Sequence, residues 1–366
     1  MMSTGGTDAG ALRVLFVGLE FDYGLPARGH SYEHLNFLDA LGRMQGVGAH
    51  FFPFDTVMRR IGRKAMNARL IRTVQDLQPD ICLFSLFTDE IDRQTIRWIT
   101  EKSGARTLNW FGDDHWRFSV YSRYWAPLFH WVLTTDSEAV EKYRAIGCHH
   151  VCKTQWACNQ SRYRHYDIPE DLDVTFVGQV HSRRRTTVEY LRKRGVDVRC
   201  WGTGWESGRL DQDEMVRLYS RSKINLSFAE SSVVAGWKPV AKIFLNRRAD
   251  DHLAVNTPAR MFGHMRMLFG GRRPQIKGRT FEIPGAGGFL LTSPADNLEE
   301  YYVPGKEIVV FQTPEDLVDM IRHYLAHPTE RRAIREAGYL RTLREHTYEQ
   351  RFREIFHNVT GGHEKA

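Results

Sequence analysis

The chain has 366 residues, which at ~150 residues per domain predicts about two domains. Its 51 Lys and Arg outnumber its 44 Asp and Glu, a net charge of +7, and 42% of its residues are hydrophobic. This composition excludes a largely disordered, collagen-like or coiled-coil protein. No apolar run approaches the ~18 residues that span a bilayer, and the N-terminus lacks the features of a signal peptide, so we expect a cytoplasmic protein.

Short apolar runs alternate with helical patterns through the first half of the chain. The first expected strand, residues 13–18, is rich in β-branched residues and ends on glycine. After a glycine-bearing loop, Leu35, Leu38 and Leu41 share one helical face. Further strands are expected at 51–54, 81–87, 107–111 and 131–135, with helices around 74–77 and 91–99. Continuous apolar strands that alternate with helices predict a parallel sheet covered on both faces.

The same pattern restarts at residues 173–178, again a strand that ends in glycine. A basic helix at 183–194 follows, and further strands are expected at 198–201, 224–228, 289–291 and 307–311. Two units that each open with strand, glycine loop and helix predict an α/β fold of two Rossmann-like domains facing an interdomain cleft. We assign 12–165 to the first domain, 166–345 to the second and 346–366 to a C-terminal helix.

Between residues 229 and 275 the alternation breaks. The segment contains Gly236-Trp237-Lys238-Pro239, Arg247-Arg248 and Gly270-Gly271-Arg272-Arg273, and it is long for a connection in a compact domain. Its aromatic and arginine residues favour a lid or binding loop, and partial disorder is the alternative.

Five cysteines are too few for a disulfide framework in a chain of this length. Cys148, His149, His150 and Cys152, followed by Cys158, have the ligand types that zinc prefers. Structural zinc sites add a second close pair elsewhere, and the sequence has none. We therefore favour buried thiols beside a strand.

The stretch 277–291, KGRTFEIPGAGGFLL, resembles the nucleotide-sugar half of a glycosyltransferase of the GT-B architecture, and is most similar to the CgeB-like group. The N-terminal half resembles this group more loosely. The stretches that agree in order and rough spacing are 173–178 with Arg183-Arg184, Trp201-Gly202, 222–226, 305–317, and, in the first half, 109–114 and 134–137. The resemblance implies an enzyme, a hexosyltransferase, that transfers a sugar from a nucleotide-diphosphate sugar to an acceptor hydroxyl.

A nucleotide sugar presents two phosphates and a ribose diol. A protein binds these groups with backbone N–H groups at a helix start, fixed cations and a carboxylate. The resemblance implies that Glu282 binds the ribose, that Arg279 and Lys277 face the diphosphate, and that Gly287 belongs to the same donor-binding motif. Without the resemblance, Glu282 is an ordinary acid at a helix start.

The restarted strand and its loop supply the second part of the expected donor site. Gly178 lets the backbone approach the phosphates, and Arg183 or Arg184 adds positive charge. The alternative is that these arginines form a solvated helix face.

One position departs from the family pattern. In related retaining enzymes a second glutamate precedes the ribose-binding one by eight positions, and the residue here is Pro274. The donor-sugar contact is therefore unassigned, and both retention and inversion stay open. A chain that binds a nucleotide sugar without transferring it is a further alternative.

An inverting reaction needs a general base within reach of the acceptor hydroxyl. His30 follows the loop of the first strand, and Asp113 and Asp114 follow the strand at 107–111, whose carboxyl end should border the cleft. The alternatives are a surface or capping role for His30, and capping of the helix near His115 for the two acids.

The resemblance implies no cofactor besides the nucleotide sugar and no obligatory metal, because helix dipoles and basic residues stabilise the diphosphate. Three acidic pairs invite comparison with the DXD metal site of the other main glycosyltransferase architecture: Asp113-Asp114, Asp171 with Asp173, and Asp211 with Asp213. Only Asp113-Asp114 follows a strand as such a site requires, and we expect no bound metal.

Two other classes of function remain as alternatives. The runs Arg183-Arg184-Arg185 and Arg247-Arg248 could contact nucleic acid, but the sequence shows no recognition motif and we expect no nucleic-acid partner. A nucleotide-sugar epimerase or sugar phosphorylase would use the same fold.

The acceptor is a glycan, small molecule, lipid or protein, and the net positive charge is compatible with peripheral membrane contact. The amphipathic segment 348–357 crosses back onto the first domain in this architecture, or packs on its own domain.

Overall fold

The computed structural model describes residues 11–229, 245–247, 253–258, 261 and 273–361. These residues divide into two compact units. The first contains the residues up to Gln155, a short hairpin within 245–255 and the residues from Arg351 onward. The second contains 156–229 and 273–350. The first stretch of unit 1 thus ends at Gln155, where the sequence analysis placed a boundary at 165. The C-terminal helix α15 (Tyr348–Thr360) belongs to the first unit from Arg351 onward.

The first unit is built on a six-stranded parallel sheet with the order β2-β1-β3-β4-β5-β6. Its strands are β1 (Leu12–Gly18), β2 (Val47–Pro53), β3 (Ile81–Phe84), β4 (Arg106–Phe111), β5 (Trp131–Thr134) and β6 (Val151–Lys153). The strand order reverses at β1, which has β2 on one side and β3 on the other. In parallel α/β sheets, ligands bind at the carboxyl ends of the strands beside such a reversal.

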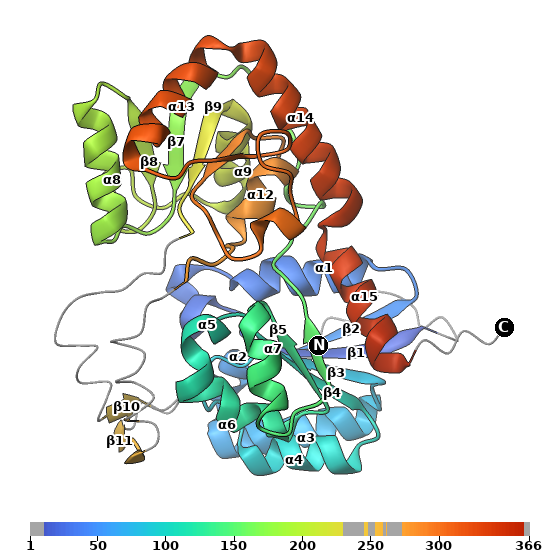
Figure 1. The fold of residues 1–366 in the computed structure, drawn as a ribbon. Helices are drawn as coiled ribbons and strands as arrows, with labels where there is room; N and C mark the ends of the chain where they lie inside the picture. The colour runs from blue at the N-terminus through green and yellow to red at the C-terminus, as the bar shows by residue number, and fades with distance from the viewer. Residues whose placement is uncertain (1–10, 230–244, 248–252, 259–260, 262–272, 362–366) are drawn as a thin grey trace. The chain divides into compact units, whose positions relative to one another are not determined.

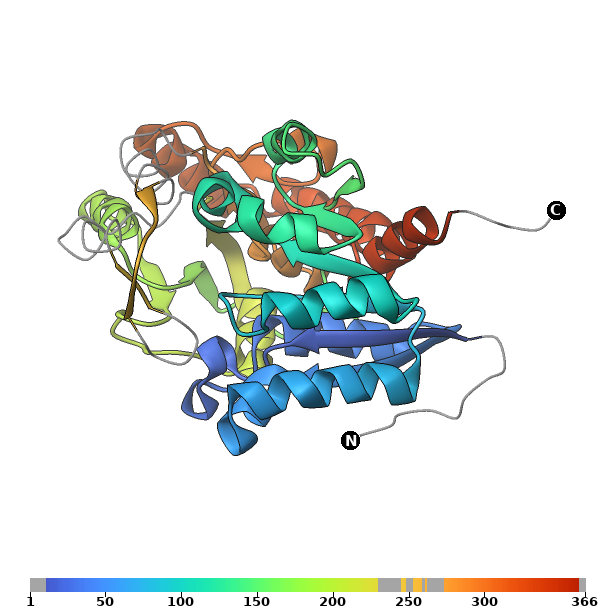
Figure 2. The same ribbon diagram turned by 90° about the horizontal axis from the view of Figure 1, so that it is seen from below.

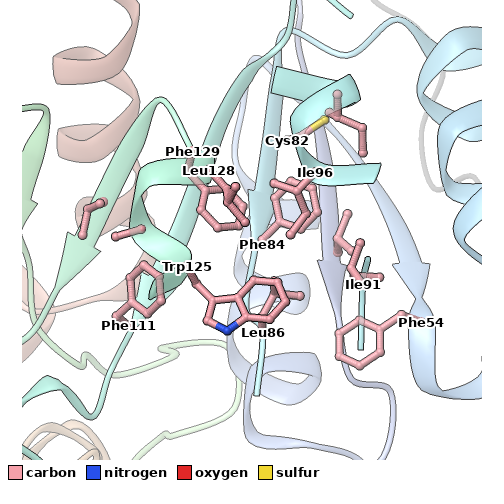
Figure 3. Packing of buried hydrophobic residues seen from close by; sticks show 14 of the residues in the cluster. Phe54, Cys82, Phe84, Leu86, Ile91, Ile96, Phe111, Trp125, Leu128 and Phe129 are labelled. Atoms are coloured by element: carbon pink, nitrogen blue, oxygen red, sulfur yellow. The ribbon is translucent and has the colours of Figure 1, made fainter. Parts of the chain in front are cut away.

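Helices cover both faces of this sheet (Figures 1 and 2). The helices are η1 (Asp22–Gly24), η2 (Pro26–Arg28), η3 (His34–Leu38), α1 (Asp39–Arg43), α2 (Phe54–Ile61), α3 (Arg63–Leu77), α4 (Arg93–Lys102), α5 (Asp114–Arg117), η4 (Phe118–Ser122), α6 (Arg123–Trp125), η5 (Ala126–Leu128) and α7 (Ser137–Arg144). On one face, strand residues such as Leu15 and Phe84 pack with Leu70 of α3 and Ile96 of α4. Figure 3 shows Phe84 and Ile96 within this cluster. The strands are apolar on both sides because both faces of the sheet are buried.

Aromatic contacts hold the opposite face. Phe37 of η3 contacts the ring of Trp110 from β4, with ring centroids 4.8 Å apart. It also meets Phe352 of α15 edge to face at 5.5 Å. The residues of α15 from Arg351 onward therefore complete the hydrophobic layer of the first unit, because such aromatic pairs bury large apolar surfaces.

The second unit has a five-stranded parallel sheet with the order β13-β12-β9-β7-β8. Its strands are β7 (Leu172–Val177), β8 (Val198–Trp201), β9 (Ser222–Ser227), β12 (Leu290–Thr292) and β13 (Val309–Val310). Its helices are α8 (Ser182–Lys193), α9 (Gln212–Arg221), α12 (Arg279–Gly285), η6 (Leu298–Glu300), α13 (Pro314–Ala326) and α14 (Pro328–Glu345). Two parallel sheets covered by helices confirm the predicted α/β fold with two Rossmann-like domains.

Two separate apolar clusters cover the faces of this second sheet. One joins strand residues such as Phe176 to Leu191 of α8 and Ile321 of α13. The other joins Tyr219 of α9 to Phe281 of α12. Because α9 and α12 lie on the same face, side chains from both helices can reach a common site near the strand ends.

The predicted strands differ from the observed ones mainly at the edges of the sheets. The expected strand at 51–54 is the end of β2, since α2 already begins at Phe54. The short edge strand β6 (Val151–Lys153) was not predicted, because three half-buried residues carry no periodic signal.

The predicted lid at 229–275 lies largely outside the described residues. Its described part includes a hairpin in which β10 (Leu245–Arg247) pairs antiparallel with β11 (Leu253–Val255). In the described part of the chain, no helix is long and apolar enough to cross a membrane.

Candidate functional site

The loop between β7 and α8 fits closely against the loop that follows β8. Gly178 donates its backbone N–H to the carbonyl of Trp201 (2.8 Å), and its own carbonyl accepts from Nε1 of Trp205 (2.9 Å). Gly202 has φ +128°, and a Cβ at this position would lie 2.3 Å from the Gly178 carbonyl oxygen. Only glycine allows this approach, so the sequence fixes the loop conformation at the carboxyl end of β7.

Two arginines from different helices meet over this loop. A Cβ on Gly178 would lie 3.0 Å from Nη1 of Arg279 and 3.4 Å from Nη1 of Arg184. Both guanidinium groups stand over the ring of Phe176, at 5.6 Å and 5.5 Å from its centroid. The ring attracts each cation, while the two cations repel one another. An anion at Gly178 would neutralise this repulsion.

His181 shows that this positive charge extends over a wider region. It occupies the N-cap position of α8, a helix of 12 residues. Burial, and after it the charges of Arg184, Arg279, Arg183 and Lys277 in that order, together lower the pKa of His181 to about 4. The structure thus places Arg184 and Arg279 beside Gly178, and Arg183 and Lys277 are close enough to act on His181. Backbone N–H groups at the start of a helix add to such an anion site.

Glu282 lies beside this region on α12, one helical turn after Arg279. Its side chain is 4% exposed. Burial, and next the Glu282 charge, raise the pKa values of the Cys158 thiol, the Tyr163 hydroxyl and the Tyr219 hydroxyl, while Arg279 opposes the shift at Tyr219. Residues three apart on a helix are neighbours, so the carboxylate lies next to the cationic cluster.

Gly287, the last residue of the expected donor set, lies in the turn after α12. It follows the end of α12 with φ +69°, and its N–H donates to the carbonyl of Pro284 (2.8 Å). A Cβ here would lie 2.6 Å from Nδ1 of His165. Gly287 therefore forms the turn that ends α12, in the left-handed conformation that glycine adopts most readily. Its observed contacts are those of the turn, with Pro284 and His165.

In the first unit, Asp114 is an interior group. It is 1% exposed, and its Oδ2 accepts hydrogen bonds from Oγ1 of Thr134 (2.7 Å) and the hydroxyl of Tyr143 (2.8 Å). Burial, helped by the charge of Asp136 and opposed by the side-chain hydrogen bonds, raises its pKa to about 7. In this structure Asp114 stabilises the packing of α5 against β5 and α7, and its carboxylate does not reach the surface.

Asp114→Asn should therefore leave turnover close to the wild-type value and change the pH dependence of stability. The pKa of Asp114 rises from its ordinary 3.8 to about 7 on folding, so its favourable contribution is present at acid pH and is lost as pH rises between these values. Asparagine does not titrate. The free energy of unfolding of the variant, relative to that of wild type, should therefore increase from pH 4 to pH 8. Urea unfolding at both pH values measures this, and a difference that is independent of pH contradicts it.

Asp113 has a separate environment. It occupies the N-cap position of α5, is half-buried, and its side chain makes no capping hydrogen bond to the helix. It lies close enough to Glu33 to influence that carboxyl. Burial, and then the charges of Asp113 and Asp22, raise the pKa of Glu33 to about 6. Glu33 precedes η3, a π-helical segment of the kind often found at functional sites.

The sequence analysis missed Glu33. The sequence feature that could have identified Glu33 is its position, three residues after His30 at the start of the helix that follows β1. The exposed ring of His30 stacks on His34 at 4.3 Å and on Phe21 at 5.4 Å, and its Nδ1 lies 3.3 Å from the Glu20 carbonyl. These contacts fix the position of the His30 ring in the loop after β1.

An exposed aromatic pair marks the reversal of strand order in the first sheet. Tyr23, in the loop after β1, is 60% exposed, and Phe87, after β3, is 40% exposed. Their rings meet edge to face at 5.3 Å. Arg28 stands over Tyr23 at 4.6 Å, and Arg117 stands over Phe87 at 5.2 Å. Aromatic and charged groups are thus available to a ligand at these strand ends.

The acidic pairs considered as metal ligands have other partners. Asp171 binds Arg221 through both carboxylate oxygens, and Asp173 pairs with Lys223 at 2.6 Å. Asp211 forms the capping box of α9. Among the residues that the structure describes, no three His, Cys, Asp or Glu side chains are grouped as metal ligands would be.

Comparisons with known proteins agree with this arrangement. A family model described as "Glycosyl transferase-like" matches residues 183–258 and 236–357. A sucrose-phosphate synthase from Thermosynechococcus elongatus is 9% identical with a TM-score of 0.58, over 96% of this chain and 99% of that one. Anabaena Alr3699/HepE in complex with UDP is 9% identical with a TM-score of 0.59, over 95% and 99%. A glycosyltransferase from Rickettsia africae ESF-5 is 10% identical with a TM-score of 0.57, over 96% and 99%. No curated protein matches.

Proposed function

Since the chain is a glycosyltransferase of the GT-B type, with two Rossmann-like domains, we propose that its second unit binds a nucleotide-diphosphate sugar and that the sugar passes to an acceptor hydroxyl bound by the first unit. The cationic cluster at Gly178 is the observation that carries this proposal. Solved structures of the similar Anabaena protein contain UDP and UDP-glucose. The motif at 277–291 further supports membership in the CgeB-like group.

The diphosphate would lie between the start of α8 and Arg279. Its charges meet Arg184 and Arg279 over Gly178, where the absence of a side chain lets phosphate oxygens reach backbone N–H groups. Glu282, one turn further along α12, would accept hydrogen bonds from the ribose hydroxyls. The same four cations supply the positive charge that a divalent metal ion supplies in other diphosphate sites, so we propose transfer without an obligatory metal or other cofactor.

On the acceptor side, we propose that Glu33 is the general base of an inverting transfer, with Asp113 tuning its pKa. A base is most effective when its pKa lies near the working pH, and the pKa of Glu33 is raised towards neutral pH. It is also half-buried, in contrast to the fully buried Asp114.

Arg279→Gln should weaken binding of the donor nucleotide by roughly 10–150-fold, because a hydrogen bond to a charged group contributes about 1.5–3 kcal/mol. The measurement is a thermal-shift panel of UDP, GDP, ADP, CMP and dTDP with their common sugars, with and without EDTA. A ligand that binds only the folded protein raises its apparent stability. One nucleotide should shift the wild-type transition regardless of EDTA, and the shift should shrink in the variant.

Lys193→Gln is the matched control, because it removes an exposed cation from the last turn of α8, far from the Gly178 loop. If the nucleotide-induced thermal shift falls equally in Arg279→Gln and Lys193→Gln, the binding reflects general electrostatic attraction and not a site at Gly178. Absence of any shift in folded wild-type protein would contradict the proposed donor binding itself.

A further inference from the structure

We propose that His181 is a contact residue for the donor diphosphate and that it takes up one proton from solvent when the diphosphate binds. This inference rests on the proposed function, and it concerns a residue outside the predicted donor set. It would make donor binding stronger as pH falls.

The position of His181 supports a direct contact. The residue closes the loop that begins at Gly178 and occupies the N-cap position of α8, where its side chain makes no capping hydrogen bond. Nε2 of His181 is buried and has no hydrogen-bond partner among the described residues. A buried nitrogen of this kind is costly to leave unpaired, and a phosphate oxygen in the loop would satisfy it.

The charges around His181 come from three segments of the chain. Arg183 and Arg184 belong to α8, and Arg279 belongs to α12. Lys277 lies in the loop before α12. Burial of the ring disfavours its charged form most, and all four cations disfavour a further positive charge, so the pKa of His181 falls to about 4. The imidazole is therefore neutral in the free protein at pH 7.

A bound diphosphate reverses this balance. In a nucleotide sugar each phosphate has one ester bond and shares the anhydride oxygen with the other, so each carries one negative charge that does not titrate between pH 5 and pH 8. These charges compensate the cations around the ring, and an imidazolium next to a phosphate is favoured. The proton comes from the buffer, and the protonated Nε2 then donates a hydrogen bond to a phosphate oxygen. No other bond is made or broken.

The sign of the pH dependence follows. Because the bound form holds the proton more tightly than the free form, lowering the pH favours binding between the two pKa values. The affinity should rise as pH falls from 8 to 5, by at most tenfold per pH unit for a single proton. A site that uses only Arg and Lys would show no such change in this range.

The first experiment counts protons. Wild-type protein is titrated calorimetrically with UDP-glucose at pH 6 in buffers of different ionisation enthalpy, and the slope of the heat against that enthalpy gives the protons exchanged. We expect uptake in wild type and essentially none in His181→Asn, which should still bind at pH 8. His357→Asn, which removes an exposed histidine of α15, should behave like wild type. Binding without proton uptake in wild type, or equal uptake in both histidine variants, overturns the inference.

The second experiment does not depend on the identity of the donor. The imidazole proton signals of His181 are followed by NMR against pH, with and without saturating sulfate, a dianion that does not titrate above pH 4. Sulfate should raise the pKa of His181 by roughly 1–3 pH units. An unchanged pKa overturns the inference. Failure of every nucleotide sugar to bind, together with a sulfate-induced rise, would instead contradict the proposed function and leave His181 as the sensor of an anion site.

Discussion

Glu33→Gln is expected to lower kcat by roughly 10²–10⁴-fold while the affinity for the donor nucleotide stays at its wild-type value. Glutamine has nearly the same shape but cannot accept the proton of the acceptor hydroxyl. Because burial and the charges of Asp113 and Asp22 raise the pKa of Glu33 to about 6, wild-type activity should fall as pH drops below about 6, where the carboxylate becomes protonated. The pH profile of kcat, measured with the identified donor and acceptor, tests both statements.

Asp113→Asn separates the two acids. It removes a negative charge that raises the pKa of Glu33, so the variant should stay active and its acid limb should move to lower pH. Glu101→Gln, an exposed change near the end of α4, is the control and should leave the profile unaltered. If Asp113→Asn abolishes turnover and Glu33→Gln does not, the base is Asp113. If both variants keep the wild-type kcat, neither acid is the base, and the proposed inverting mechanism is contradicted.

The core of the fold could be predicted because its strands are buried on both sides. β1 has a continuous buried apolar run at 14–17 and ends on Gly18, and β7 is rich in apolar residues and is followed directly by Gly178, a signal strong enough to place both units. Edge strands carry no such signal. β6 has three half-buried residues and β13 has two residues, so their pairing depends on the neighbouring strand more than on their own sequence.

The residues of the proposed donor site could be located in part from the sequence. The motif placed Arg279 and Glu282, and the strand–glycine–helix pattern placed Gly178 and Arg184, because these depend on local sequence. The burial of Asp114 could not be predicted beside its half-buried neighbour Asp113. It depends on hydrogen bonds from Thr134 and Tyr143, which lie 20 and 29 residues further along the chain. For the same reason the surroundings of Glu33 and His181 became visible only in the fold.

Glu282→Gln should weaken binding of the donor nucleotide by roughly 10²–10⁴-fold, which corresponds to two hydrogen bonds from ribose hydroxyls to a charged acceptor at about 1.5–3 kcal/mol each. The fold should persist, since glutamine fits the same volume and removes a buried charge from beside Tyr163 and Tyr219. Glu336→Gln, an exposed change on α14, is the control. Titration calorimetry with the nucleoside diphosphate selected by the ligand panel measures the loss.

A double-mutant cycle then assigns the loss to the ribose. Wild-type protein should bind the 2′,3′-dideoxy form of the nucleotide far more weakly than the nucleotide itself, whereas Glu282→Gln should discriminate little between them. If the two losses simply add, Glu282 acts on the site indirectly, through the packing of α12 against Tyr219. Strong coupling, combined with an unchanged affinity of Glu282→Gln for sulfate, would separate ribose recognition by the carboxylate from anion binding by Arg184 and Arg279. Each part of the donor would then have its own determinant on the second unit.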